Sequence, residues 1–290
     1  MNQKHVLAVH DISCVGRCSL TVALPVISAA GIMTSVLPTA VLSTHTGGFT
    51  GYTYRDLTAD ILPIADHWQT LQDNLAPFNA IYTGYLGSYE QINLVKELAK
   101  RFKKPETLLI VDPVMADNGK LYPGFSEDFP QAMAQLCAQA DVIVPNITEA
   151  LLMLGKPYNP GPYTEDYIKG LLQDLGKLGE TGKKVVLTGV YFDENGEYGA
   201  AAYDSATSEG AIVLGERIPG YYHGTGDLFA SVLTAALVNG CKLGKATKVS
   251  TEFTADSIKR TYQAKTDIKY GVNFEEGLKL LSDLINLEDV

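Results

Sequence analysis

The sequence lacks the features that would tie it to nucleic acid, to membranes or to metal-thiolate chemistry. Its formal net charge is −10, which argues against nucleic acid and anionic membranes as partners. No apolar stretch approaches the ~18 residues of a membrane span, and residues 1–11 show no signal-peptide pattern. CxxC spacing, typical of a zinc site or a redox dithiol, is absent among the four cysteines, Cys14, Cys18, Cys137 and Cys241. We therefore expect a reduced, cytoplasmic protein.

The chain does contain an alternation of strand-like and helical segments, in a composition that is 46% hydrophobic and 19% charged. Buried strands are predicted at 5–9, 80–86, 107–114, 141–146 and 183–190, and helices at 18–31, at 88–102 and through the last quarter. Pro25 weakens the first helix, residues 33–43 are expected to form a strand that runs into another element, and Asn195–Gly196 predicts a hairpin. This order predicts an α/β fold with a mostly parallel sheet, and the lack of linkers or repeats predicts a single domain over residues 1–290.

The stretch HGTGDLF (223–229) places Asp227 directly after two glycines, at the expected start of a helix. The glycines allow successive backbone N–H groups to point at one spot, so Gly224, Thr225 and Gly226 are candidates for an anion hole. A carboxylate there would repel a resting phosphate, but it is useful if it accepts a proton from a hydroxyl group that attacks the phosphate. Asp227 is therefore a candidate general base. The alternative is that it only complements the helix dipole.

Polar residues also follow two other predicted strands. Asn146 ends one strand and Glu149 comes three residues later, a spacing that resembles a capping box and then needs no ligand. The alternative is that these oxygens organise Mg²⁺ and nucleotide phosphates. Asp112 ends another strand and is well placed for a metal or phosphate site, with Asp117 in the loop beyond it. An Asp-Pro turn with solvated acids is the alternative.

The loop after the first strand offers Asp11 and Ser13 as hydrogen-bonding groups for a small ligand. Arg17 is a binding residue or a surface residue at a helix start. Cys14 and Cys18 are expected to be small packing residues, because no base is evident beside them.

Residues 43–57 are polar and rich in Gly, Thr and Tyr, so they form either a lid over a site or a long surface hairpin. His45 within them is either structural or part of the site. Tyr85, at the end of a predicted strand, either stacks on a ligand ring or packs against the protein.

The order of these segments resembles that of the ribokinase-like superfamily, and within it the pyridoxal kinase group. The motifs are THTG, TGY, DPVMAD, PNITEA, VVLTG and GTGDLF, in this order over nearly the whole chain. The resemblance implies a mostly parallel sheet with helices on both faces and a small lid-like segment. It also implies phosphorylation by ATP of the 5′-hydroxymethyl group of pyridoxal, pyridoxine or pyridoxamine, as in vitamin B6 salvage. Mg²⁺ and a homodimer are implied too, and a monovalent cation such as K⁺ fits the family.

The resemblance assigns roles to single residues. Asp227 matches the catalytic base of the family, and the residues that match its anion hole are Gly224, Thr225 and Gly226. The residues that match substrate-binding positions are Asp11, Ser13, His45, Thr46, Tyr85 and Asp227. The residues that match nucleotide-binding positions are Asp112, Asp117, Tyr122, Asn146, Glu149, Thr188, Gly224 and Gly226. The residues that match metal-binding positions are Asp112 and Glu149.

One departure from the pyridoxal kinase pattern leaves an alternative open. The first-strand loop, HDISCVGR, is closer to that of the hydroxymethylpyrimidine kinases, so a kinase of that type or of dual specificity is the enzymatic alternative. Those kinases typically have cysteine where this chain has Asp227, which favours the pyridoxal side. A sugar or nucleoside kinase fits the THTG and TGY segments less well. The alternative from another class is a vitamer-binding regulatory protein on a kinase fold, which would have no need of the base.

Overall fold

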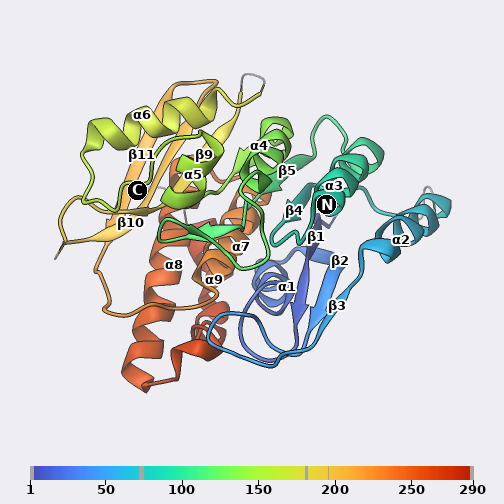
Figure 1. The fold of residues 1–290 in the computed structure, drawn as a ribbon, viewed down its shortest axis with the longest axis horizontal. Coiled ribbons are helices and arrows are strands. Elements are labelled where there is room, and N and C mark those ends of the chain that lie inside the picture. Colours follow the sequence, from blue (N-terminus) through green and yellow to red (C-terminus); the bar gives the residue numbers. More distant parts are fainter. Residues whose placement is uncertain (1–2, 72–74, 180–181, 195, 288–290) are drawn as a thin grey trace.

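The computed structural model describes residues 3–71, 75–179, 182–194 and 196–287, and its centre is a nine-stranded sheet (Figure 1). The strands follow one another across the sheet in the order β11 (Glu209–Gly215), β10 (Tyr198–Asp204), β9 (Lys184–Val190), β8 (Val142–Ile143), β5 (Leu108–Val111), β4 (Ala80–Thr83), β1 (His5–Ser13), β2 (Met33–Leu42) and β3 (Tyr54–Asp56). The strands from β9 to β2 pair in parallel, and antiparallel strands extend the sheet at both edges. The predicted mostly parallel sheet is confirmed.

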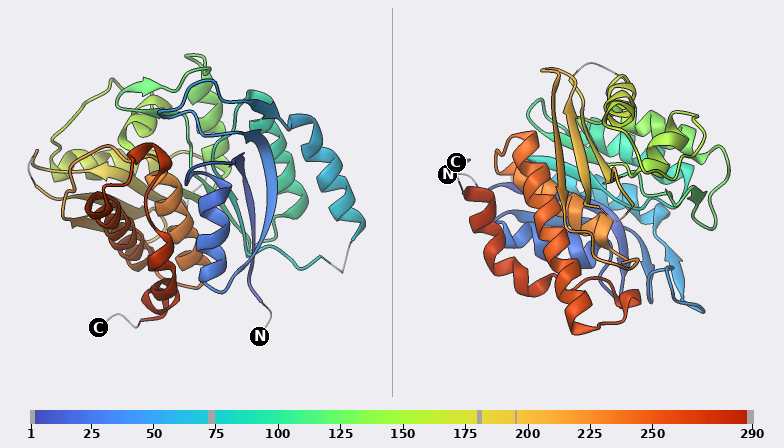
Figure 2. Two further views of the ribbon diagram at one scale, coloured as in Figure 1. Left: turned by 90° about the horizontal axis from the view of Figure 1, so that it is seen from below. Right: turned by 90° about the vertical axis from the view of Figure 1, so that its left-hand side faces the viewer.

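Helices cover both faces of this sheet, as the two views of Figure 2 show. One face carries α1 (Leu20–Ala29), α7 (Thr225–Val238), α8 (Leu243–Ala264) and α9 (Leu278–Asn286). The other face carries α2 (Thr58–Thr70), α3 (Tyr89–Phe102), α4 (Phe129–Gln139), α5 (Ile147–Met153) and α6 (Glu165–Gly176). Successive residues of β1 alternate between the two cores, with Val6 facing α1 and α7, and Leu7 facing the opposite layer. Burial on both faces explains why the central strands are continuous apolar runs.

Local signals account for several element boundaries. Ser88 caps α3, because its Oγ accepts a hydrogen bond from the backbone N–H of Gln91 at 3.1 Å, as predicted. Helix α1 forms although Pro25 lies inside it, and it buries its inner face against α7. The strand predicted at residues 33–43 is confirmed, but it does not run into another element, since Met33–Leu42 form one continuous strand. Asn195 of the predicted hairpin lies outside the described residues, but β9 and β10 on either side of it pair in antiparallel fashion.

Two small segments lie near the carboxyl ends of the parallel strands. Strands β6 (Ala116–Asp117) and β7 (Lys120–Leu121) form a separate two-stranded sheet. Residues 43–53 connect β2 to the edge strand β3, which pairs with β2 in antiparallel fashion, so this segment is a hairpin extension of the sheet. Whether the segment after β2 closes over a ligand as a lid stays a prediction. Within the described parts of the chain, no helix is both long and apolar enough to cross a membrane.

Candidate active site

The predicted site residues gather where the parallel strands end. Asp11 and Ser13 lie at the end of β1, Asp112 follows β5 directly, and Asn146 follows β8. The register between β1 and β2 shifts between His10 and Ile12, so Asp11 sits at an irregularity that alters the direction of the strand. Tyr85 comes two residues after β4, and Thr188 lies in the last part of β9. This edge is where open α/β sheets bind their ligands.

Three acidic side chains from different elements share this edge: Asp112, Glu149 of α5 and Asp227 of α7. Asp112 and Glu149 are buried, with 6% and 3% of their surface exposed. Burial, and then the charges of Glu149 and Asp227, raise the pKa of Asp112 well above its ordinary value. Burial also raises the pKa of Glu149 to about 8, although backbone N–H groups oppose this effect. The site therefore concentrates negative charge that a bound cation or a proton would neutralise.

Asp227 lies in the first turn of α7, as predicted. Gly224 is the N-cap at φ +74°, and a Cβ there would lie 2.1 Å from the carbonyl oxygen of Arg17, so this position requires glycine. Gly226 differs, because a Cβ there would meet no described atom within 4 Å. The fold itself does not require glycine at 226, which leaves room for the close approach of a ligand. Burial raises the pKa of Asp227, which makes its carboxylate a better proton acceptor.

The Asn146–Glu149 pair forms a complete capping box at the start of α5. The Asn146 side chain accepts from the Glu149 N–H at 2.9 Å and donates to the carbonyl oxygen of Ala116 at 2.8 Å. Each Glu149 carboxylate oxygen accepts a backbone N–H, from Asn146 at 2.9 Å and from Met115 at 3.1 Å. The capping alternative is therefore confirmed, and the predicted contacts of both residues with metal and nucleotide stay predictions. The carboxylate oxygens of Glu149 retain lone pairs for a water molecule bound to a metal.

The residues present fit Mg²⁺ held largely by water and phosphate. In the described part of the chain, no set of three or more His, Cys, Asp or Glu side chains is arranged to hold a metal ion. The buried carboxylate of Asp112 receives no hydrogen bond from any described residue, and it lies beside two further acids. Mg²⁺ is usually bound by one or two carboxylates, with water and substrate phosphates completing the octahedron. Asp112, with Glu149 nearby, supplies the one or two carboxylates that such a site needs, but the described residues do not form a complete set of protein ligands.

On the substrate side, the predicted polar residues mainly bond to one another. The Asp11 carboxylate accepts hydrogen bonds from Ser13 Oγ at 3.0 Å and Ser19 Oγ at 2.5 Å. His45 is buried; its Nδ1 accepts from the N–H of Gly47 at 3.2 Å, so its Nε2 donates to the carbonyl oxygen of Lys269 at 2.6 Å. These bonds fix the side chains of Asp11 and His45, so any contact with a ligand would use the lone pairs and ring faces that remain.

Tyr85 and Thr46 keep more freedom. Tyr85 is partly buried; burial, and then the charges of Tyr54 and Asp11, raise the pKa of Tyr85 to about 12, so its phenol stays protonated. The rings of Tyr85 and Phe125 lie 5.7 Å apart. Thr46 is exposed on the loop after β2. Tyr85 therefore supplies an aromatic ring near Asp11, and Thr46 supplies an exposed hydroxyl on the loop after β2.

On the nucleotide side, Asp117 lies on β6, and its Oδ2 accepts a hydrogen bond from the Tyr221 hydroxyl at 2.8 Å. This bond joins the β6–β7 sheet to the segment before α7. Tyr122 follows β7, and burial, and then the charges of Glu149 and Tyr221, raise its pKa above the ordinary value. Thr188 donates its N–H to the carbonyl oxygen of Pro145 at 3.0 Å, which places it beside Asn146. The predicted nucleotide residues therefore lie around the same edge, and their contacts with nucleotide stay predictions.

The sequence reasoning missed one contact at the candidate base. Cys18 was expected to be a small packing residue because no base was evident beside it. The carboxylate of Asp227 does lie beside it, because Cys18 Sγ donates a hydrogen bond to Asp227 Oδ2 at 3.2 Å, so the reason for that expectation was wrong. Arg17, the neighbouring residue, forms an ion pair with Glu275 at 2.5 Å and is partly exposed. Short motifs gave no signal for either contact, because the partners lie more than 200 residues apart in the sequence.

Comparisons with known proteins identify the family and the fold. A family model described as phosphomethylpyrimidine kinase matches residues 24–272. A crystal structure from Bacteroides thetaiotaomicron, of a protein assigned as a phosphomethylpyrimidine kinase and in a form with pyridoxal, is 37% identical, with a TM-score of 0.88 over 98% of this chain and 96% of that chain. The pyridoxal kinase of Lactobacillus plantarum is 33% identical, with a TM-score of 0.86 over 97% of each chain. The pyridoxal kinase PdxY of Vibrio parahaemolyticus is 31% identical over 70% of this chain and 68% of its own length.

The family match covers far more than half of the chain, and the solved relatives share the fold over nearly its full length. The chain therefore belongs to the phosphomethylpyrimidine kinase family of the ribokinase-like superfamily, with pyridoxal kinases among its homologues.

Proposed function

We propose that this protein is a pyridoxal kinase that transfers a phosphoryl group from ATP to the 5′-hydroxymethyl group of pyridoxal, pyridoxine or pyridoxamine, with Asp227 as the general base. The observation that carries the proposal is the position of Asp227. It lies directly after the Gly224–Gly226 turn, at the edge that also holds Asp112 and Glu149. The kinases among the homologues, and the form with pyridoxal of the Bacteroides thetaiotaomicron relative, support the reaction and the substrate class.

The chemistry assigned to Asp227 is a single proton transfer. The carboxylate accepts the proton of the substrate hydroxyl while the hydroxyl oxygen forms a bond to the γ-phosphorus, and the bond from that phosphorus to the β–γ bridging oxygen breaks to leave ADP. The raised pKa of Asp227 favours this role. Backbone N–H groups of Gly224, Thr225 and Gly226, at the positive end of α7, stabilise the charge on the transferred group.

The nucleotide and the metal belong on the acidic side of the site. Asp112 and Glu149 would hold Mg²⁺, which when bound offsets the repulsion between the phosphates of ATP and these acids. Asp117, Tyr122, Asn146 and Thr188 surround the same edge and would position the nucleotide.

The vitamer belongs on the side of β1 and β4. Tyr85 would stack on the pyridine ring, because its partly buried ring lies close to the Asp11 carboxylate. His45, Thr46, Ser13 and Asp11 would contact the ring substituents. The bonds that already fix Asp11 and His45 would hold these two side chains in place before the vitamer binds.

The second candidate function is phosphorylation of hydroxymethylpyrimidine, alone or in addition. The first-strand loop HDISCVGR and the description of the matching family favour it. The aspartate at position 227 favours the pyridine vitamers. A binding protein without activity is disfavoured, because such a protein has no need of a partly buried carboxylate beside a glycine turn.

The single domain over residues 1–290, the homodimer, the monovalent cation and the cytoplasmic location stay predictions.

The test is a substrate panel with ATP and Mg²⁺, in which each product is identified by mass. Pyridoxal, pyridoxine, pyridoxamine and hydroxymethylpyrimidine are compared by kcat/KM. We expect phosphorylated pyridine vitamers, with hydroxymethylpyrimidine turned over more slowly. Turnover of the pyrimidine alone would establish the second candidate, and binding of pyridoxal with no product would favour the binding protein.

A further inference from the structure

Asp227 is held by a segment of the first-strand loop, residues Cys18 and Ser19. The Cys18 thiol donates to Asp227 Oδ2 at 3.2 Å. The backbone N–H of Ser19, the next residue, also lies near the Asp227 carboxylate and opposes the rise in its pKa. Two adjacent residues of the first-strand loop therefore face the candidate base.

Ser19 also connects the loop to Asp11, the other carboxylate on the substrate side. Its hydroxyl donates to Asp11 Oδ1 at 2.5 Å, and its side chain is buried. Its backbone has φ 53° and ψ −129°, a conformation that costs energy for any residue other than glycine. The surrounding contacts must hold that conformation, and its effect is to direct the N–H of Ser19 toward Asp227 and its hydroxyl toward Asp11.

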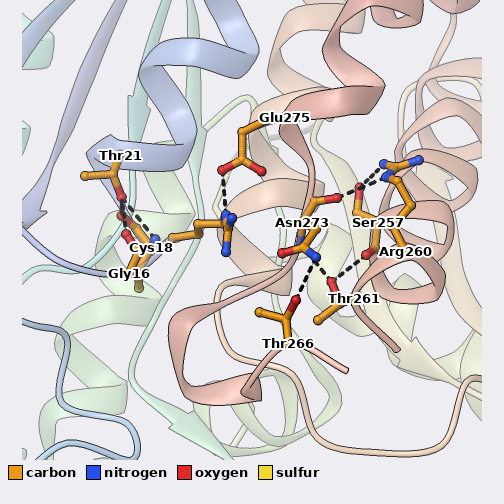
Figure 3. A network of polar contacts seen from close by, with 10 residues as sticks. Gly16, Cys18, Thr21, Ser257, Arg260, Thr261, Thr266, Asn273 and Glu275 are labelled. Atoms are coloured by element: carbon orange, nitrogen blue, oxygen red, sulfur yellow. Dashed lines mark hydrogen bonds and ion pairs between the residues drawn. The ribbon is translucent and has the colours of Figure 1, made fainter. Parts of the chain in front are cut away.

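The loop that carries Cys18 is itself anchored at several points (Figure 3). The Thr21 hydroxyl accepts the N–H of Cys18 at 3.2 Å and donates to the carbonyl oxygens of Gly16 and Cys18. Arg17 forms its ion pair with Glu275, and its N–H donates to the carbonyl oxygen of Tyr270 at 3.0 Å. The thiol of Cys18 is therefore presented to Asp227 from a fixed backbone rather than from a free loop.

We propose that Cys18 and Ser19 are positioning residues for the base: together they orient the Asp227 carboxylate so that the oxygen not bonded to the thiol faces the substrate hydroxyl. The proposal rests on the proposed role of Asp227. The Cys18 thiol is suited to donate, because burial, and then the charges of Asp227 and Asp11, raise its pKa well above the ordinary value.

The first test compares Cys18→Ala and Cys18→Ser with the wild type in steady-state kinetics on pyridoxal. Losing a hydrogen bond to a charged group costs roughly tenfold or more in rate, so Cys18→Ala should lower kcat by roughly tenfold with little change in KM. Cys18→Ser keeps a donor and should recover most of kcat. Cys14→Ala is the matched control, since Cys14 is an exposed cysteine of the same loop.

The second test does not depend on turnover. Because the Asp227 charge contributes to the raised pKa of the Cys18 thiol, Asp227→Asn should let this thiol ionise more readily. Alkylation of Cys18 by iodoacetamide, followed by peptide mass, should then be faster by roughly threefold or more, with the rate at Cys14 unchanged as an internal reference.

The outcomes separate this proposal from the proposed function. A wild-type kcat in Cys18→Ala, or an equal loss in the alanine and serine variants, would overturn the positioning role. An unchanged alkylation rate at Cys18 in Asp227→Asn would overturn it too. Full activity of Asp227→Asn would instead overturn the role of Asp227 itself.

Discussion

Replacing Asp11 by asparagine should stabilise the fold at neutral pH, because folding buries a carboxylate that the unfolded chain exposes. Burial is the main cause that raises the pKa of Asp11 from 3.8 to about 6, and the charge of Asp227 adds to it. Hydrogen bonds from Ser19 and Ser13 oppose the shift without cancelling it. Asparagine is neutral, can accept from Ser19, and can donate to the hydroxyl of Ser13.

The size of the effect follows from the pKa shift. The folded state binds more protons than the unfolded state between about pH 4 and pH 6, so the free energy of unfolding of the wild type falls as pH rises through this window. A shift of about two units at ~1.4 kcal/mol per unit gives roughly 3 kcal/mol. We therefore expect Asp11→Asn to be more stable by up to about 3 kcal/mol near pH 7.5, and equal to the wild type near pH 4.

Urea unfolding followed by circular dichroism across this pH range measures the difference directly. Catalytic efficiency toward pyridoxal should fall in the same variant, because the charge of Asp11 is removed from the proposed substrate side. A variant that is less stable than the wild type near pH 7.5, or a difference that does not change with pH, would refute the reasoning. Either result would mean that the hydrogen bonds of Asp11 outweigh the cost of burying its charge.

Three further predictions follow from single contacts. Gly224→Ala should lower the free energy of unfolding, measured in urea, by at least ~2 kcal/mol, because its Cβ would lie 2.1 Å from a carbonyl oxygen. Gly226→Ala should fold normally and lower kcat by roughly tenfold or more. Lys183→Met should cost about 2–4 kcal/mol with unchanged activity per folded molecule, because its buried ammonium binds carbonyl oxygens at the end of α4. Ser88→Ala should cost ~1 kcal/mol through loss of the α3 cap, and no loss in urea unfolding would contradict that account.

The elements that could be predicted from the sequence are those with strong local signals. The apolar runs at β1, β5 and β9 are buried on both faces, and α3 begins at its serine cap, so periodicity and capping were sufficient there. A strand was predicted at residues 33–43, but not that it continues unbroken from Met33 to Leu42. Its pairing with β1 and β3 decides its length, and local sequence does not contain that information.

The candidate site was predictable at the strand ends but not in its contacts. Asp112 and Asp227 lie where the strand and helix signals placed them. The N-x-x-E pattern proved to be a capping box, which the pattern alone could not separate from a nucleotide motif. His45 bonds to the Lys269 carbonyl and Cys18 to Asp227, and each pair joins segments more than 200 residues apart. Such contacts depend on the packing of the whole fold rather than on spacing.

The most direct test of the central claim is the turnover of Asp227→Asn with pyridoxal, ATP and Mg²⁺, beside circular dichroism and pyridoxal binding on the same preparation. We predict a normally folded variant that binds pyridoxal and whose kcat is lower by roughly 10²- to 10⁴-fold, the usual contribution of a general base. A kcat within a few-fold of the wild type would contradict the assignment of Asp227 as the base.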